Sequence, residues 1–325
     1  MRLVGALIST AVLAAAVAST APAQVVACGA EVTADLTLEA PLTGCSTGLI
    51  VAADDVTIDL NGHAIEGIGT SEGSGIEGVD RSGLTIRNGH IRGFRTGVRF
   101  FRTSESTLED LAVSDTFFGI VLGGEPVIGP GSDHNEVLRT SIVNAQQGLV
   151  LGSASSWNRI LQNSVTGVSG AGISCSLGTG NVFDGNYTVG NGVGISLNFC
   201  SVSDVINNVA NQNVFTGIAR ARTAGRVEGN VANGNGQWGI YSDDSHGAFI
   251  GNVTNQNGFD GLRIDDSVSS HGPFHSVAQH VANTNGGHGI VTDLEGVVDG
   301  GKNRAHANGA SVQCLGVVCN QKGGP

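Results

Sequence analysis

Three aspartates near the end of the chain have a spacing that could hold a cation. Asp243, Asp265 and Asp293 each come three residues after an aliphatic residue that follows a glycine. If equivalent residues stack on neighbouring strands, these carboxylates repel unless a cation lies among them, a proton is shared or water screens them. Carboxylate oxygens are the ligands that calcium prefers. We therefore predict a Ca²⁺ site at Asp243, Asp265 and Asp293, and the alternative is a water-screened acidic ladder.

The same segment offers groups for acid–base chemistry. Arg263 lies between the second aspartate and its aliphatic residue, Asp266 follows that aspartate, and His288 stands one repeat later. Carboxylates and imidazoles whose pKa values are shifted by such neighbours act as general acids and bases. The candidate catalytic residues are Asp243, Asp265, Asp266, Arg263 and His288.

A second group of charged residues lies near the start. Six of the fourteen arginines fall between residues 81 and 102. Guanidinium groups bind anionic sugars through charge-assisted hydrogen bonds, and the alternative is a solvated face that offsets acidic neighbours. We name Arg95 and Arg99 as candidate binding residues, together with Tyr241 at the equivalent phase further along the chain.

A repeat of about 22 residues must position these groups. Glycine followed by an aliphatic residue recurs in steps of 22, 22, 29, 24, 22, 23, 22, 22 and 28. Such a period indicates stacked units that each fail to bury their own apolar face, and the Val, Ile, Gly and Asn content argues against leucine-rich repeats. The ten aliphatic residues are Ile76, Val98, Ile120, Leu149, Ile173, Ile195, Ile218, Ile240, Leu262 and Ile290.

Positions one and three after each aliphatic residue should face outward along one side of the solenoid. Small residues fill the middle of these columns, and larger ones stand at both ends. Two longer repeats carry insertions at residues 123–134 and 265–275, about 29 Å apart if turns are spaced by roughly 4.8 Å. This arrangement favours an elongated ligand.

Other residues have structural interpretations. Asparagines at steps of 22 predict ladders of hydrogen-bonded amides at turns, the first being Asn186, Asn208, Asn230 and Asn252, and the second Asn191, Asn213, Asn235 and Asn257. Arg220 falls at an inward position, where we expect a local register shift rather than a buried charge. Trp157 and Trp238 are either packing residues or platforms for sugars.

The ends of the chain predict export. Arg2, an apolar run and Ala21-Pro22-Ala23 form a signal peptide over residues 1–23. An oxidising compartment favours disulfides, which we expect at Cys28–Cys45, Cys175–Cys200 and Cys314–Cys319. The two cysteines of the middle pair are separated by about one repeat, so that disulfide would bridge neighbouring turns. A net charge of -12 excludes nucleic acid as a partner, and no apolar run is long enough to span a membrane.

Two segments carry a family resemblance. Val-Thr-Ile-Asp-Leu-Asn-Gly-His at 56–63, echoed by Leu-Thr-Ile-Arg-Asn-Gly-His at 84–90, resembles the opening turns of exported bacterial right-handed parallel β-helix proteins, and residues 313–319 resemble their tail. The resemblance covers nearly all of the mature chain. It implies a triangular coil of parallel strands, as in pectate lyases, mannuronan epimerases, polygalacturonases and the β-helix protein of nitrous oxide reductase maturation.

The resemblance does not carry one activity over. The paired aspartates of polygalacturonases precede the aliphatic residue, whereas Asp265 and Asp266 follow Leu262, and only Asp260 and His288 match that phase. The mannuronan epimerase Asp-Pro-His element is missing. The maturation protein also suggests copper delivery. The sequence argues against it, because Met1 is its one methionine and its histidines are not clustered as metal ligands.

We therefore expect an all-β protein of ten to eleven coils: a signal peptide at 1–23, a disulfide-bearing cap at 24–50, the β-helix at 51–306 and a disulfide-bearing tail at 307–325. We expect a secreted or periplasmic monomer that interacts with extracellular or cell-envelope polysaccharide. The alternatives are a lyase, epimerase or glycoside hydrolase acting on such polymers, and a structural or adhesive rod.

Overall fold

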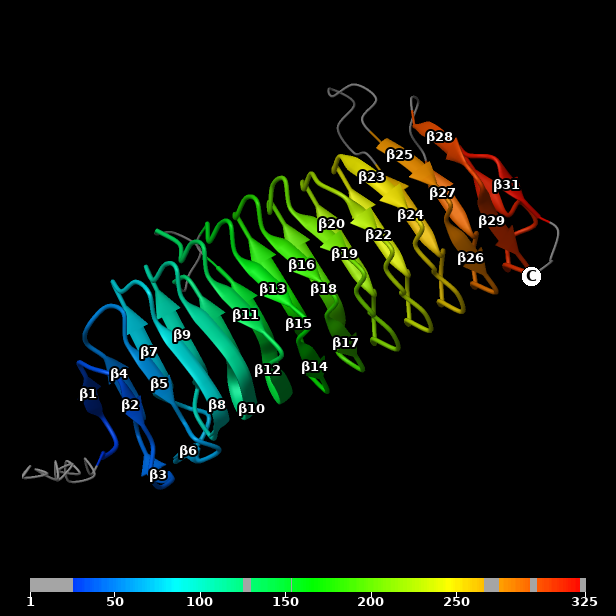
Figure 1. Cartoon of the computed structure of the whole chain (residues 1–325). Helices are drawn as coiled ribbons and strands as arrows, with labels where there is room; N and C mark the ends of the chain where they lie inside the picture. Colours follow the sequence, from blue (N-terminus) through cyan, green and yellow to red (C-terminus); the bar gives the residue numbers. More distant parts are fainter. Residues whose placement is uncertain (1–25, 125–129, 153, 266–274, 293–296, 322–325) are drawn as a thin grey trace, which may run out of the picture.

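The chain forms a right-handed parallel β-solenoid of about 12 turns with about 23 residues in each (Figure 1). The computed structural model describes residues 26–124, 130–152, 154–265, 275–292 and 297–321, and no helix occurs among them. The all-β prediction is confirmed, and the number of turns is slightly higher than expected. Paired strands continue beyond the predicted boundaries, because β1 pairs with β4 near the start and β27 pairs with β30 near the end.

Three parallel ladders, which we call A, B and C, form the three sides of the coil. Ladder A contains β1 (Ala30–Val32), β4 (Leu49–Val51), β7 (Ser74–Val79), β9 (Thr96–Phe101), the ends of β10 (Thr107–Leu122) and β12 (Ser141–Leu151), β15 (Ala171–Ser176), β18 (Val193–Asn198), β20 (Ile218–Ala221), β22 (Ile240–Asp243), β24 (Leu262–Asp265), β27 (Ile290–Thr292) and β30 (Cys314–Leu315).

Ladder B follows ladder A in each turn. It contains β2 (Leu36–Thr37), β5 (Thr57–Asp59), the starts of β8 (Thr85–Arg92) and β10, β11 (Glu136–Leu138), β13 (Arg159–Leu161), β16 (Val182–Asp184), β19 (Asp204–Ile206), β21 (Val227–Glu228), β23 (Gly247–Ile250), β25 (His275–Ala278) and β28 (Val298–Gly301).

Ladder C completes the turn. It contains β3 (Leu42–Cys45), β6 (Ala64–Gly67), the end of β8, the middle of β10, the start of β12, β14 (Ser164–Thr166), β17 (Tyr187–Val189), single bridges at Val209, Val231 and Val253, β26 (Val281–Asn283), β29 (Asn303–His306) and β31 (Cys319–Asn320).

The repeated glycine–aliphatic pair builds ladder A. All ten aliphatic residues predicted to stack are paired in register from one turn to the next, and each is fully buried. The preceding glycine is required because consecutive turns approach closely there: a Cβ added at Gly239 would lie 2.6 Å from the carbonyl oxygen of Gly261. Each turn therefore buries one aliphatic side chain and needs a residue without Cβ beside it, which explains why the glycine–aliphatic pair recurs once per turn.

Buried asparagines hold the corners together, as predicted. Asn208 is typical: its Nδ2 donates to Phe183 O at 2.9 Å and to Asn230 Oδ1 at 3.0 Å, and its backbone nitrogen also donates to Asn230 Oδ1. The two predicted ladders lie at the corner between B and C and at the corner between C and A. Because these amides are buried and bonded to each other, their role is structural.

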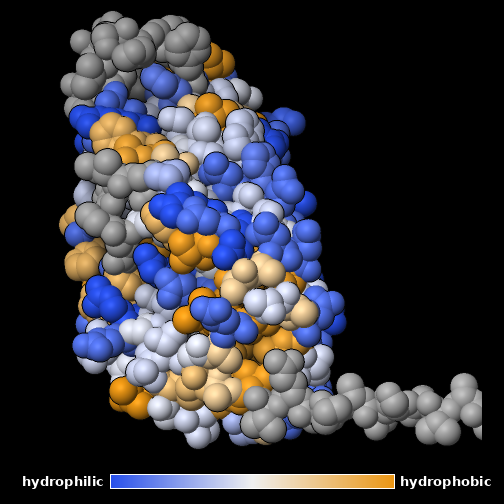
Figure 2. Space-filling view, turned by 90° about the vertical axis from the view of Figure 1, so that its left-hand side faces the viewer, coloured by the Kyte–Doolittle hydropathy of each residue, from blue (hydrophilic) through white to orange (hydrophobic). Residues whose placement is uncertain are grey.

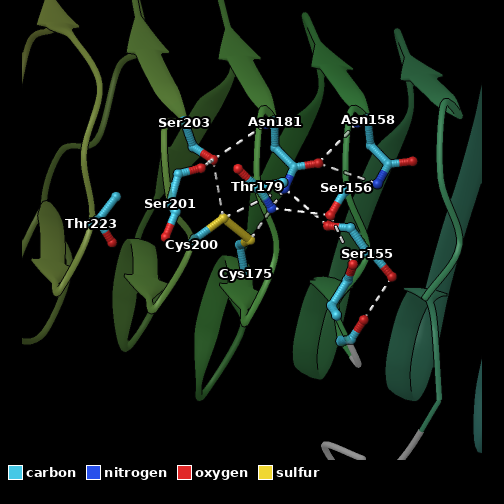
Figure 3. Close-up of a disulfide and its surroundings, with 12 residues drawn as sticks. Ser155, Ser156, Asn158, Cys175, Thr179, Asn181, Cys200, Ser201, Ser203 and Thr223 are labelled. Carbon is cyan, nitrogen blue, oxygen red and sulfur yellow. Dashed lines mark hydrogen bonds between the residues drawn. A yellow bond between two sulfur atoms is a disulfide. The ribbon is translucent and has the colours of Figure 1, made fainter. Parts of the chain in front are cut away.

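A third amide ladder, which the sequence analysis did not predict, lies at the corner between ladders A and B. Asn135, Asn158 and Asn181 bond in sequence, and the ladder then passes to the hydroxyl of Ser203. The disulfide Cys175–Cys200 lies beside this change (Figure 3), where Asn181 Nδ2 contacts both sulfur atoms at 3.5 Å. The covalent link therefore supports the corner at the turn where the amides end.

The structure contains the three predicted disulfides, Cys28–Cys45, Cys175–Cys200 and Cys314–Cys319. The first and last lie in the first and last turns of the part of the chain that the structure describes. The middle one joins β15 to the corner after β18, so it connects neighbouring turns. Such cross-links limit the freedom of the unfolded chain and stabilise the fold.

The prediction for Arg220 is wrong. Its strand keeps register, with Leu197, Arg220 and Ser242 aligned on successive turns, so the arginine points into the coil and is 1% exposed. The extra residue in the preceding step is accommodated before β20 rather than within it. The interior therefore contains a buried charge.

The apolar core lies inside the coil. Figure 2 shows that apolar side chains reach the surface facing the viewer in patches separated by polar ones. No helix long and apolar enough to span a membrane occurs in the part of the chain that the structure describes. The predicted signal peptide lies outside that part.

Candidate functional site

The outer surface of ladder A places three candidate residues, Arg99, Tyr241 and Arg263, in one column. Six steps of the ladder separate Arg99 from Tyr241, and the next strand adds Arg263. This column consists of Glu77, Arg99, Val121, Val150, Ser174, Ser196, Ala219, Tyr241, Arg263 and Val291. Small residues therefore lie between two groups of larger ones, as predicted, and two valines of the column, Val121 and Val291, are buried.

Three rings form an aromatic cluster near the C-terminal end of this surface. Trp238 stacks on Tyr241 with ring centroids 4.7 Å apart, and Phe259 meets Trp238 edge to face at 5.1 Å. Trp238 and Tyr241 are half-buried, whereas Phe259 is 47% exposed. Trp238 and Phe259 stand at the corner before β22 and β24, and Tyr241 lies on β22, so the cluster spans two turns. It offers ring surface to a ligand without further rearrangement.

A charged cluster of Asp260, Arg263, Asp265 and His288 adjoins the rings. Arg263 pairs with Asp265 at 2.9 Å and with Asp260 at 3.3 Å. Asp260 Oδ1 accepts from the backbone nitrogen of His288 at 2.7 Å and lies 3.2 Å from its Nδ1. The Asp260 side chain is 8% exposed and those of Arg263 and His288 about 30%, so solvent reaches the guanidinium and the imidazole while the Asp260 carboxylate stays inside.

Two of the three aspartates predicted to stack lie among the described residues, and they are aligned on neighbouring turns. Asp243 and Asp265 are aligned on β22 and β24. Burial raises the pKa of Tyr241, as do the negative charges of Asp243 and Asp265, while Arg263 opposes them. Asp266 and Asp293 lie outside the described residues, so their part in the predicted acid–base or calcium site stays a prediction.

Within the described ranges, no three His, Cys, Asp or Glu residues are arranged to hold a metal ion. One carboxylate of the predicted calcium site, Asp265, already pairs with Arg263. Since a guanidinium neutralises this carboxylate, the repulsion that motivated a cation there is reduced.

Arg95 and Arg99 lie together at the opposite end of the ladder A surface. They line a cavity of about 330 Å³ with Glu77, Thr47 and Val121, among others. Arg99 Nη1 bonds Glu77 Oε1 at 2.6 Å, and the Arg95 guanidinium lies 4.8 Å from the Phe117 ring centroid. The carboxylate and the ring hold both guanidinium groups at the cavity wall.

Three other arginines of this sequence cluster spread around the coil. Arg87 pairs with Asp59 on ladder B, Arg92 pairs with Glu66 on ladder C, and Arg102 pairs with Asp80 beyond the end of β9. Each joins an acid one turn earlier. The interpretation as charges that offset acidic neighbours therefore fits these three residues, and Arg95 with Arg99 remains the predicted binding pair.

The sequence pointed to Arg263 and His288, but not to their arrangement. Asp260 was singled out by its phase with His288 and was not among the candidates, although it bonds both. Phe259 was missed. Its signal is the column it shares with Phe215, two turns earlier, since both follow a ladder asparagine by two residues.

Two family models match parts of the chain. Residues 41–188 match the model described as right handed beta helix region, and residues 124–270 match that of the periplasmic copper-binding protein NosD. No curated protein matches the chain in sequence.

Solved structures share the fold at low sequence identity. DFA-IIIase from Arthrobacter chlorophenolicus has a TM-score of 0.55 and 13% identity, over 85% of this chain and 83% of that one. The periplasmic alginate epimerase AlgG has a TM-score of 0.54 and 14% identity, over 88% and 72%. The Dettilon tailspike protein has a TM-score of 0.51 and 14% identity over 88% of this chain, which spans 60% of the tailspike's length, less than two thirds.

The described residues do not fit the copper that the NosD description implies. All six cysteines form disulfides, Met1 lies outside the described residues, and no metal-holding group is found among those that are described. The ladder register, the two family-model matches and the structural neighbours agree on the fold. The chain is a right-handed parallel β-helix repeat protein.

Proposed function

We propose that the outer surface of ladder A binds an elongated extracellular or cell-envelope polysaccharide. The observation that carries this proposal is the single column that joins the Arg95–Arg99 cavity to the aromatic cluster across a floor of small residues. The structural neighbours support it, because an alginate epimerase and a tailspike share the fold.

The chemistry of the surface suits sugars. Aromatic faces pack against the C–H faces of sugar rings, while arginine, serine and asparagine side chains bond hydroxyl and carboxylate groups. The floor carries Ser174, Ser176, Ser196 and Asn198, which add hydroxyl and amide partners without obstructing a chain. A ligand from Arg99 to Tyr241 would extend about 29 Å at 4.8 Å per turn.

Export belongs to this proposal. Three disulfides fit an oxidising compartment, and the predicted signal peptide would direct the chain there. The partner would then be a polymer outside the cytoplasm.

We expect Trp238→Ala and Tyr241→Ala each to weaken retention by an immobilised glycan about tenfold or more, because each removes ring surface from the aromatic cluster. The ligand is chosen first on a glycan array, and affinity electrophoresis then compares the variants. Tyr187→Ala is the matched control, since Tyr187 is 46% exposed on ladder C. Equal retention of all three variants and wild type would exclude this surface. No binding to any glycan would favour a structural rod.

The charged cluster favours a second function, acid–base chemistry on the bound polymer. Asp260 orients His288 through Nδ1, which leaves Nε2 available to take a proton, and the carboxylate stabilises the imidazolium that forms. For a lyase, we expect unsaturated uronate to appear in the absorbance assay and His288→Ala to abolish it while glycan retention is kept. If the wild type retained the glycan but released no product, lyase activity would be excluded and glycan binding would remain as the function.

A further inference from the structure

Arg220 carries a guanidinium inside the coil whose hydrogen bonds are incomplete. Its Nη2 donates to the carbonyl oxygens of Thr223 and His246 at 3.2 Å and of Gly225 at 3.4 Å. Its Nε and Nη1 are buried and have no partner. Three N–H groups of the guanidinium are therefore left without acceptors, although the side chain is 1% exposed and its Cζ lies 5.5 Å from the Phe249 ring centroid.

No carboxylate among the described residues pairs with this charge. The negative charge of Asp204 acts on Arg220 electrostatically, but Asp204 forms its ion pair with Arg226 at 2.9 Å on the outside of the coil. Burial lowers the pKa of Arg220 to about 10, so the guanidinium is still protonated at neutral pH. A buried cation without a counter-charge is strongly unfavourable.

Ser242 adds a further unpartnered donor beside it. It is paired in register with Arg220 on the next turn, it is fully buried, and its hydroxyl has no hydrogen-bond partner. The same inward column holds Leu151, Leu197 and Ile264 at other turns. Ser242 is smaller than these side chains and presents a hydroxyl to the same interior column as Arg220.

We propose that Arg220 and Ser242 bind a small monovalent anion such as chloride inside the coil. The Arg220 Nε and Nη1 groups and the Ser242 hydroxyl supply the donors, and the anion supplies the missing negative charge. A water molecule would accept the same hydrogen bonds but would leave the charge uncompensated. A monovalent anion balances the single charge of the guanidinium, whereas sulfate would leave an excess negative charge inside the coil.

Crystals grown or soaked in bromide test the site directly. We expect an anomalous peak within hydrogen-bond distance of Arg220 Nη1 and Ser242 Oγ in the wild type, and none in Arg220→Leu. Leucine matches Leu197 on the preceding turn, so this variant should fold. A bromide-free wild-type site filled by water would overturn the proposal.

Chloride dependence of unfolding tests it in solution, at constant ionic strength with gluconate as the replacement. Above its dissociation constant, each tenfold rise in chloride should lower the wild-type unfolding equilibrium constant about tenfold. Arg220→Leu should show no such response, and Ser242→Ala should need about five- to tenfold more chloride. If Arg220→Leu fails to fold, the chloride dependence of Ser242→Ala unfolding still tests the proposal. A wild type indifferent to chloride, or variants that respond as it does, would contradict the inference.

Discussion

Replacing Asn230 with alanine should lower the free energy of unfolding by roughly 3–5 kcal/mol, because it breaks the buried ladder between B and C in two places. Asn230 Oδ1 accepts from the backbone nitrogen and Nδ2 of Asn208 at 2.8 and 3.0 Å, and its own Nδ2 donates to Val205 O at 2.8 Å. Alanine leaves the Asn208 backbone nitrogen and the Val205 carbonyl oxygen buried without these partners, while Asn208 Nδ2 keeps its bond to Phe183 O. Urea unfolding followed by circular dichroism measures the loss.

Asn233 provides the matched control in the same turn. It also belongs to an asparagine column, but it is half-buried on the outside, where Asn255 N donates to its Oδ1 at 2.7 Å. Water can replace this bond, so Asn233→Ala should cost less than about 1 kcal/mol. Equal losses in the two variants would show that burial of the amide is not what makes the inner ladder important.

The second large effect concerns His280, which interrupts that inner ladder. It lies between Asn252 and Asn303, is fully buried, and its Nδ1 has no hydrogen-bond partner among the described residues. Burial lowers the pKa of His280 to about 3, from 6.5. As the pH falls below about 6.5, the His280 imidazole binds a proton in the unfolded chain but stays neutral in the folded chain. Wild-type stability should therefore fall by roughly 1.4 kcal/mol per pH unit from this histidine.

His280→Asn restores the residue type of the ladder and removes this dependence. We expect the variant to match wild type within about 1 kcal/mol at pH 8 and to exceed it by roughly 2–3 kcal/mol more at pH 4.5, measured by urea unfolding at each pH. His306→Asn, at an exposed position on β29, should leave the wild-type slope unchanged. Parallel pH profiles for wild type and His280→Asn would show that His280 does not stay neutral.

The sequence allowed prediction of the repeating parts of the fold for a physical reason. Each turn meets the same steric and hydrogen-bonding demands, so Gly239 with Ile240, or Asn208 with Asn230, recur at fixed phase. The amide ladder from Asn135 to Asn181 was overlooked because its steps are 23 residues and its next member is Ser203. The Ser203 hydroxyl accepts the same hydrogen bond as an asparagine amide oxygen would, but a search for repeated asparagines does not detect it.

Departures from the repeat were harder to predict. A buried charge is costly, which favoured a shifted register at Arg220, yet backbone carbonyl groups at the corner accept part of its hydrogen bonding and keep it inside. At the candidate site, the alignment of Asp243 with Asp265 follows from spacing alone. The contact of Trp238 with Phe259 crosses a corner between different columns, which linear spacing does not report.

Binding measured against oligosaccharides of increasing length tests most directly whether the ladder A surface holds an extended polymer. Calorimetry on a series of one glycan should show affinity rising until the ligand reaches from Arg99 to Tyr241, about 29 Å, and then levelling off. In Tyr241→Ala the gain from the longest members should disappear while short members still bind. Affinity independent of ligand length, or a length dependence untouched by Tyr241→Ala, would contradict an extended site on this surface.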